Sequence, residues 1–179
     1  ISDSTIHTIC IHEDILFAGS QEASLQPAPG QASCFLKTWT MSTQARYIPD
    51  IAHGRFMIMS MVATKHGLAS LCFSGVEVRP HPQFRCKFNI RKTAITALGA
   101  FESRFAYAMQ DGLIRVRSMI TGDFLHSVRH HAFRCTLRSI SMHADMIVAA
   151  FDGRIAVWSH DLGRCLLTLN LTTSDAHTV

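Results

Sequence analysis

The side chains of this 179-residue chain that could do chemistry are mainly its 11 histidines and six cysteines. Zinc prefers imidazole and thiolate ligands, and the closest gathering of the two types is His126, His130, His131 and Cys135. These four residues lack the paired spacing of zinc sites, in which two cysteines are separated by a few residues. We therefore predict no metal site and no cofactor.

Enzymatic chemistry would need a nucleophile next to a base that an acid orients. The sequence contains no nucleophile elbow, no glycine-rich loop for phosphate and no paired-carboxylate motif. The six cysteines form no C-x-x-C pair and most lie in apolar runs, so we expect free, buried thiols in a reducing compartment. The sequence therefore predicts a protein that is not an enzyme and that is cytoplasmic or nuclear.

One stretch of the chain carries a stripe of basic side chains with no acidic residue among them: Arg79, Arg85, Lys87, Arg91 and Lys92. Such a stripe could bind the phosphates of an anionic lipid surface. The formal net charge is only +4, so no nucleic-acid partner is expected. Basic and apolar residues alternate over residues 84–88, which favours a solvated outer strand over a binding site.

A repeated unit positions these side chains. The turn Asp111-Gly112 opens an alternating run that ends at Arg117. The turn Asp152-Gly153 opens the equivalent run 41 residues later, and this run ends at Trp158. A period in this range, with a tight polar turn before each run, is typical of four-stranded β-propeller blades.

Two weaker copies of the run lie nearer the N-terminus and end at Trp39 and Arg79. We call the place shared by Trp39, Arg79, Arg117 and Trp158 the Trp position. A buried arginine there would need a partner carboxylate or a bound acidic peptide. A locally rotated strand would instead let the arginine reach solvent, and drift in a degenerate repeat is the favoured explanation.

We therefore predict an all-β chain of about four four-stranded antiparallel blades that form part of a β-propeller. The predicted blades span about residues 5–48, 55–91, 94–129 and 136–171, and residues 174–179 would begin a further blade. Proline and glycine in residues 26–33 predict a surface loop within the first blade. Four blades alone would leave two apolar end faces uncovered, so we expect the remaining blades to come from the same or another chain.

On these turns and runs, nearly the whole chain resembles WD-repeat propellers, whose rings more often close with seven blades. In that family a buried hydrogen-bond relay joins a histidine before the first strand, an aspartate before the third strand and a tryptophan within it. The resemblance implies relay roles for His131 (or His130), Asp152 and Trp158 in the last blade, for Asp111 in the third and for Trp39 in the first.

The chain departs from the family pattern in two respects. Ala149 or Ala150 stands where the relay has serine or threonine. The Trp-Asp pair is also missing, since Trp39 is followed by Thr40 and Trp158 by Ser159. The relay implied by the resemblance is therefore incomplete.

The predicted function is a non-catalytic protein–protein interaction scaffold, because propellers present loops from every blade on two rims. Other proteins or peptides would bind these rims inside the cell. The alternative is a propeller that binds phosphoinositides or another anionic membrane through the basic stripe. The candidate binding residues are Arg79, Arg85, Lys87 and Arg117.

Overall fold

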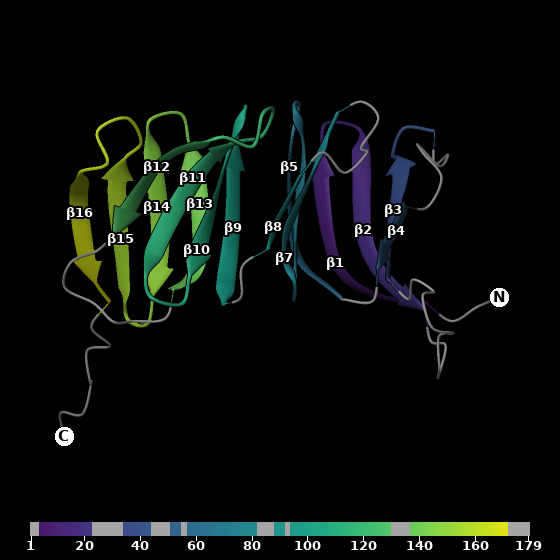
Figure 1. The fold of residues 1–179 in the computed structure, drawn as a ribbon, viewed down its shortest axis with the longest axis horizontal. Helices are drawn as coiled ribbons and strands as arrows, with labels where there is room; N and C mark the ends of the chain where they lie inside the picture. The colour runs from purple at the N-terminus through teal and green to yellow at the C-terminus, as the bar shows by residue number, and fades with distance from the viewer. Residues whose placement is uncertain are drawn as a thin grey trace, which may run out of the picture.

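The computed structural model describes residues 4–22, 34–43, 51–54, 57–81, 88–91, 94–129 and 137–171. In these ranges the chain forms sixteen β-strands joined by turns (Figure 1). The described residues include no helix that could cross a membrane. The strands form four antiparallel sheets of four, and neighbours in each sheet are neighbours in the chain. This arrangement confirms the all-β class and the four four-stranded units.

We number the sheets 1 to 4 in chain order. Sheet 1 contains β1 (Ser4–His12), β2 (Ile15–Glu22), β3 (Cys34–Thr40) and β4 (Ile51–Gly54). Sheet 2 contains β5 (Ile58–Thr64), β6 (Gly67–Cys72), β7 (Gly75–Pro80) and β8 (Phe88–Arg91). Sheet 3 contains β9 (Ile95–Phe101), β10 (Arg104–Met109), β11 (Leu113–Ser118) and β12 (Phe124–Arg129). Sheet 4 contains β13 (Leu137–His143), β14 (Met146–Phe151), β15 (Arg154–Ser159) and β16 (Cys165–Asn170).

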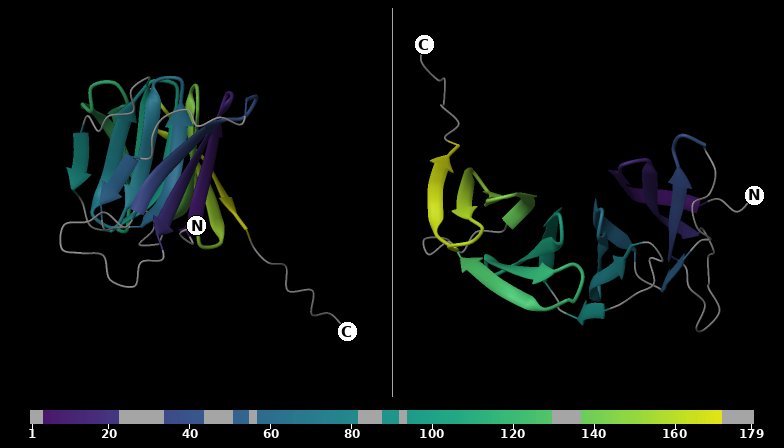
Figure 2. Two further views of the ribbon diagram at one scale, coloured as in Figure 1. Left: turned by 90° about the vertical axis from the view of Figure 1, so that its right-hand side faces the viewer. Right: turned by 90° about the horizontal axis from the view of Figure 1, so that it is seen from above.

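The four sheets fan along an arc, and each sheet faces the next (Figure 2). The first strands of successive sheets are in contact, β1 with β5, β5 with β9 and β9 with β13. Each fourth strand lies at the opposite edge of its sheet. The molecule therefore has a propeller-like arrangement, in which sheet faces form the junctions and turns form two rims.

The same backbone hydrogen bond closes one end of every sheet. The residue after the third strand donates its N–H to a carbonyl in the turn between the first two strands. The four bonds are Met41 to Asp14 (2.7 Å), His81 to His66 (3.1 Å), Met119 to Ser103 (2.7 Å) and His160 to Asp145 (2.7 Å). We call this end rim A and the opposite end rim B. The donor of this bond lies two residues after the Trp position in each sheet. Because the bond joins backbone atoms, it identifies equivalent positions in the four sheets whatever side chains they carry.

Rim B contains the two Asp-Gly turns that the sequence predicts. The φ angles of Gly112 (78°) and Gly153 (72°) lie in the left-handed region, which glycine adopts without steric strain. The Asp111 carboxylate accepts the backbone N–H of Leu113 at 3.1 Å and so stabilises its own turn.

Apolar side chains fill the three junctions between sheets. The largest cluster lies between sheets 3 and 4, a second between sheets 2 and 3, and a smaller one between sheets 1 and 2. Two glycines allow the backbones to approach closely. A Cβ atom at Gly99 would lie 2.9 Å from Ile140, and one at Gly19 would lie 2.9 Å from Ile58. These distances are shorter than van der Waals contact, so a larger residue would force the sheets apart.

The exposure of each described cysteine depends on the strand that carries it. Cys34 and Cys72 are buried, and burial raises the pKa of the half-buried Cys10 thiol. Cys165 is exposed, which differs from the expectation of buried thiols, because β16 is the outer strand of the last sheet. Cys86 and Cys135 lie outside the described residues.

Candidate functional site

The four residues at the Trp position occupy equivalent places in the sheets. Each lies opposite the second residue of the neighbouring strand, in the pairs Leu16–Trp39, Leu68–Arg79, Phe105–Arg117 and Ile147–Trp158. Because side chains alternate along a strand, the four point to the same side of their sheets. That side faces the preceding sheet wherever there is one, as the packing of Trp158 against sheet 3 shows.

The two tryptophans differ in what covers them. Trp158 is 1% exposed and its ring meets Phe151 edge to face, with centroids 6.2 Å apart. Trp39 is half-buried on the outward side of sheet 1. There it lines an apolar hollow together with Ile6, Ile9 and Leu16. The same position is therefore core in sheet 4 and surface in sheet 1.

The two turn aspartates lie at the surface and bind arginines. Asp152 accepts a hydrogen bond from Arg138 Nε at 2.8 Å, and Asp111 accepts one from Arg129 at 2.9 Å. The arginine is therefore the polar side-chain partner of each carboxylate among the described residues. His131, the histidine of the implied relay, lies outside those residues, so the relay stays a prediction.

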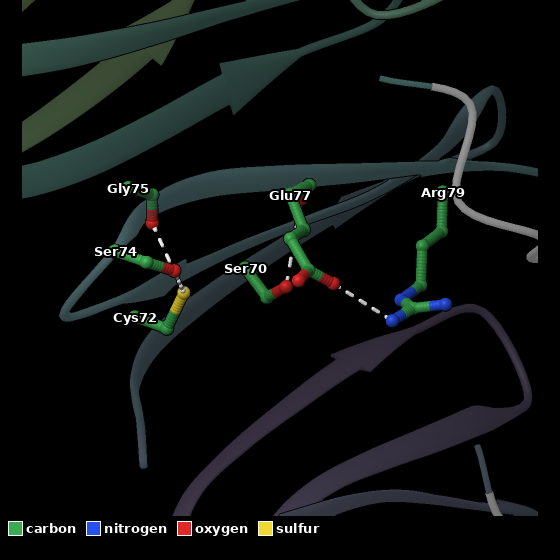
Figure 3. Close-up of polar contacts among 6 residues, drawn as sticks. All are labelled: Ser70, Cys72, Ser74, Gly75, Glu77 and Arg79. Atoms are coloured by element: carbon green, nitrogen blue, oxygen red, sulfur yellow. Dashed lines mark hydrogen bonds and ion pairs between the residues drawn. The ribbon is translucent and has the colours of Figure 1, made fainter. Parts of the chain in front are cut away.

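Arg79 is buried in the junction between sheets 1 and 2. Only 4% of the residue is exposed, and its Nη2 lies 2.8 Å from Oε2 of Glu77 on the same strand (Figure 3). Ser70 Oγ, on β6, donates to the Glu77 carbonyl at 3.5 Å. The carboxylate that a buried arginine needs is therefore supplied from within the chain.

Cys72 stabilises the turn between β6 and β7 of sheet 2. Its Sγ donates to the Gly75 carbonyl at 3.4 Å and lies 3.1 Å from Ser74 Oγ (Figure 3). These contacts stabilise the β6–β7 turn. They thereby fix the position at which β7, the strand that carries Arg79, begins.

The other candidate binding residues are placed as follows. Arg117 is half-buried, and its Nη1 donates to the Gly122 carbonyl at 2.7 Å, which ties β11 to the β11–β12 turn. Arg85 and Lys87 lie outside the described residues. Arg79 on β7 and Arg117 on β11 therefore lie in different sheets, and a shared binding site of the four residues stays a prediction.

A polar cluster that sequence reasoning missed lies on rim A between sheets 3 and 4. Arg104 Nη1 lies 2.9 Å from Nδ1 and 3.2 Å from Nε2 of the buried His160 ring. Asp161 Oδ1 lies 3.7 Å from the same guanidinium nitrogen and 3.5 Å from His160 Nδ1. One carboxylate thus partly balances an arginine and an imidazole that face each other.

The surroundings of the cluster lower the pKa of two imidazoles. Burial lowers the pKa of His160, and the charge of Arg104 lowers it further, while Asp161 acts in the opposite direction. The His126 ring meets the His160 ring edge to face at 4.9 Å. Burial also lowers the pKa of His126, followed by the charges of His160 and Arg104. Within the described part of the chain, His126 Nε2 is buried without a hydrogen-bond partner.

The cluster borders a hollow of about 270 Å³ that opens on rim A. Its lining includes Phe101, Glu102, Arg104, Asp145, His160 and Asp161. No three metal-binding side chains converge anywhere in the described ranges. The lining of the hollow offers charged and hydrogen-bonding groups to a polar ligand or a peptide side chain.

The sequence held a partial signal for this cluster. His160 follows the third strand, at a position that holds methionine in sheets 1 and 3 and His81 in sheet 2. A polar residue at a position that is apolar in two of the four sheets marks a place where a partner is needed if the side chain is buried. Its partner Arg104 lies 56 residues away, so the pairing could not be inferred without the blade geometry.

No protein-family model matches the chain, and no curated protein sequence matches it. Two designed proteins of known structure are similar to it. The computationally designed Ika8 protein is 20% identical with a TM-score of 0.70, over 92% of this chain and 48% of that one. The computationally designed Ika4 protein is 19% identical with a TM-score of 0.66, over 87% of this chain and 91% of that one. The chain therefore spans about half of Ika8, and the likeness supports the propeller-like fold alone.

Proposed function

We propose that the chain is a non-catalytic interaction module of the WD-repeat propeller type, which recruits other proteins or peptides to a complex in the cytoplasm or the nucleus. The observation that carries this proposal is the separation of faces from rims. Sheet faces are used in the junctions, whereas turns from all four sheets are displayed side by side on rim A. A partner can therefore contact several sheets at once.

Rim A is suited to binding because its turns are held in place. The four equivalent backbone bonds fix each third strand to the turn beside it. A surface that is ordered before binding loses less conformational entropy when a partner arrives. The hollow at Arg104 adds charged groups to this surface, and a few such residues commonly dominate binding energy.

We also propose that the four sheets are part of a larger ring, with the remaining blades supplied by the same or another chain. The arc of sheets supports this proposal, as do the apolar side chains on the outward side of sheet 1. An isolated arc keeps those side chains in water, whereas a further blade would bury them.

The lipid-binding alternative has less support. Arg79 is buried and bound to Glu77, so it is not available to a membrane surface. Arg91 is exposed on β8, while Arg85, Lys87 and Lys92 lie outside the described residues. Sedimentation with phosphoinositide vesicles would detect this activity. Binding that disappears when Arg85, Lys87, Arg91 and Lys92 are reversed to glutamate would favour a membrane role.

The interaction role is tested by comparing the proteins that the chain retains from a cell extract. Substituting Glu102→Lys with Asp161→Lys changes rim A at two exposed residues. Phe73→Ser changes an exposed residue of rim B and is the matched control. We expect a specific set of proteins that the rim A variant loses and the control keeps, with circular dichroism unchanged. The proposal is wrong if the folded chain retains nothing beyond what a heat-unfolded sample retains.

A further inference from the structure

Two sheet faces have no sheet packed on them among the described residues. The N-face is the side of sheet 1 turned away from sheet 2, and the C-face is the side of sheet 4 turned away from sheet 3 (Figure 2). The registers place Ile6, Ile9, Ile11, Leu16, Ala18 and Trp39 on the N-face. They place Val148, Ala150, Ile155, Val157, Leu167 and Leu169 on the C-face. Both faces are mainly apolar, although Ser20 and Lys37 also lie on the N-face and Ser139 and Ser141 on the C-face.

The N-face repeats the face of sheet 4 that is buried against sheet 3. The cross-strand pairs Ile11–Leu16, Leu16–Trp39 and Ile9–Ala18 correspond to Met142–Ile147, Ile147–Trp158 and Ile140–Ala149. Ile6 and Leu137 also correspond, because each lies just before the same register shift in the first strand. The copy departs at Ser20, Phe35 and Lys37, where sheet 4 has Phe151, Arg154 and Ala156.

The matching residues are all large and apolar but differ in whether a neighbouring sheet covers them. Leu137, Ile140 and Met142 are 1%, 6% and 7% exposed under the cover of sheet 3. Their counterparts Ile6, Ile9 and Ile11 are 53%, 62% and 56% exposed. The apolar hollow beside them measures about 420 Å³. Large aliphatic side chains gathered on one exposed face mark an interaction surface.

The C-face repeats the face of sheet 3 on which Trp158 rests. Ala150, Ile155 and Val157 take the places of Ala108, Ile114 and Val116, and Leu167 and Leu169 take the places of His126 and Val128. Leu169 is 46% exposed where Val128 is 2% exposed. Ser141 stands in the place of Gly99, so a sheet packed here would lie slightly farther away than sheet 4 lies from sheet 3.

We propose that a second copy of this chain binds the C-face with its N-face. Trp39 of the second copy would then share an apolar cluster with Val157, as Trp158 shares one with Val116. The chain already forms this type of contact between sheets 3 and 4, and it carries both halves of that contact again, uncovered, at the two ends of the arc. The proposed junction therefore repeats, between two copies, the interface that exists between sheets 3 and 4 within the chain.

Two such junctions close a ring of two chains. A head-to-tail contact makes a closed ring when the rotation per copy completes a circle, and an open filament when it does not. The chain covers 48% of the Ika8 chain, so two copies in sequence would have about its extent. This inference rests on the proposed ring and not on partner binding at rim A. Its failure would leave the rim A experiment unaffected.

The test is the mass of the purified chain in solution, measured by light scattering over a range of concentrations. We expect a species of about twice 19.9 kDa. Trp39→Arg blocks the N-face and Val157→Arg blocks the C-face, and each should weaken assembly at least about 30-fold, as loss of an interface hot spot does. Leu162→Arg places the same charge on an exposed leucine of rim A and should leave the dimer intact.

Mixing the two blocked variants distinguishes a head-to-tail contact from other kinds. Each variant alone should be a monomer, whereas the mixture keeps one intact junction and should form a one-to-one dimer. Leu167→Arg replaces Val157→Arg if circular dichroism shows that the latter does not fold. A wild-type chain that stays monomeric would overturn the proposal, as would a dimer that only one of the two substitutions weakens. Large aggregates that neither substitution changes would overturn it too.

Discussion

Sheets 1 and 4 carry a similar apolar pattern on the side that holds the Trp position. In sheet 4 that side is buried and Trp158 is 1% exposed. In sheet 1 the corresponding side borders a hollow, and Trp39 is only half-buried. The comparison teaches that the strand pattern determines which side of a sheet is apolar. A neighbouring sheet then determines whether that side is core or surface.

Sheet 2 extends the comparison to charge. At the Trp position it carries Arg79, which is buried against sheet 1 and paired with Glu77 at 2.8 Å. The position therefore accepts a guanidinium in place of an indole when a carboxylate lies two residues away on the same side of the strand. The junction between sheets 1 and 2 contains a smaller apolar cluster than the one between sheets 3 and 4.

The largest expected effect separates the two tryptophans. Trp158→Ala should lower the free energy of unfolding by about 3–5 kcal/mol, because it leaves a cavity in the largest cluster. Trp39→Ala should cost less than half as much when it is compared with the wild type below the concentration at which the proposed dimer forms. Urea unfolding of both variants measures the difference. Equal losses would show that the two sides are not core and surface.

The next effect concerns the buried ion pair. Glu77→Gln should lower the free energy of unfolding by about 3 kcal/mol, since it leaves the Arg79 charge buried beside a neutral amide. The double substitution Glu77→Leu with Arg79→Leu should lie within about 1 kcal/mol of the wild type, because both charges are gone. Urea unfolding of the single and double variants checks this. A double variant less stable than Glu77→Gln would contradict the account of sheet 2.

The junction between sheets 3 and 4 should respond to pH through its two imidazoles. The pKa values of His126 and His160 are lowered in the folded protein from the ordinary 6.5. Below that pH the unfolded chain therefore binds more protons, and folding loses stability as the pH falls. Melting temperatures at mildly acidic and at neutral pH measure the loss. This loss of stability at mildly acidic pH should be smaller when both histidines are replaced by glutamine. A loss that stays unchanged in that variant would show that other groups cause it.

The smallest effect is expected at rim B. Asp152→Ala removes an exposed partner of Arg138, and exposed ion pairs contribute little to stability. Its unfolding midpoint in urea should match that of the wild type within error. A large loss would instead indicate that Asp152 belongs to the buried relay of WD-repeat propellers.

Much of the fold could be predicted from local sequence. The Asp-Gly turns and the alternating runs indicate hairpins, and the 41-residue period indicates four equivalent sheets. The Trp position was also found in all four sheets, including the two where arginine occupies it. These features depend on residues close together in the chain, where turn geometry and side-chain alternation act.

The site could be predicted only in part, because it depends on which sheets meet. The sequence indicated that a buried arginine needs a carboxylate, and it did not identify Glu77 as the partner of Arg79. Arg104 and His160 meet because two turns of different sheets lie together on rim A. Distances of this kind are set by the junctions between sheets and leave no local pattern.

The most direct test of whether the Trp position is core in sheet 4 and surface in sheet 1 uses the chain's two tryptophans. Two variants are made, each of which keeps one tryptophan. Trp39→Phe reports on Trp158, Trp158→Phe reports on Trp39, and acrylamide quenching measures how readily solvent reaches each indole. Below the concentration at which the proposed dimer forms, we expect Trp158 to be shielded with blue-shifted emission and Trp39 to be readily quenched. Equal quenching of the two, or a shielded Trp39 beside an accessible Trp158, would contradict the arrangement of sheets described above.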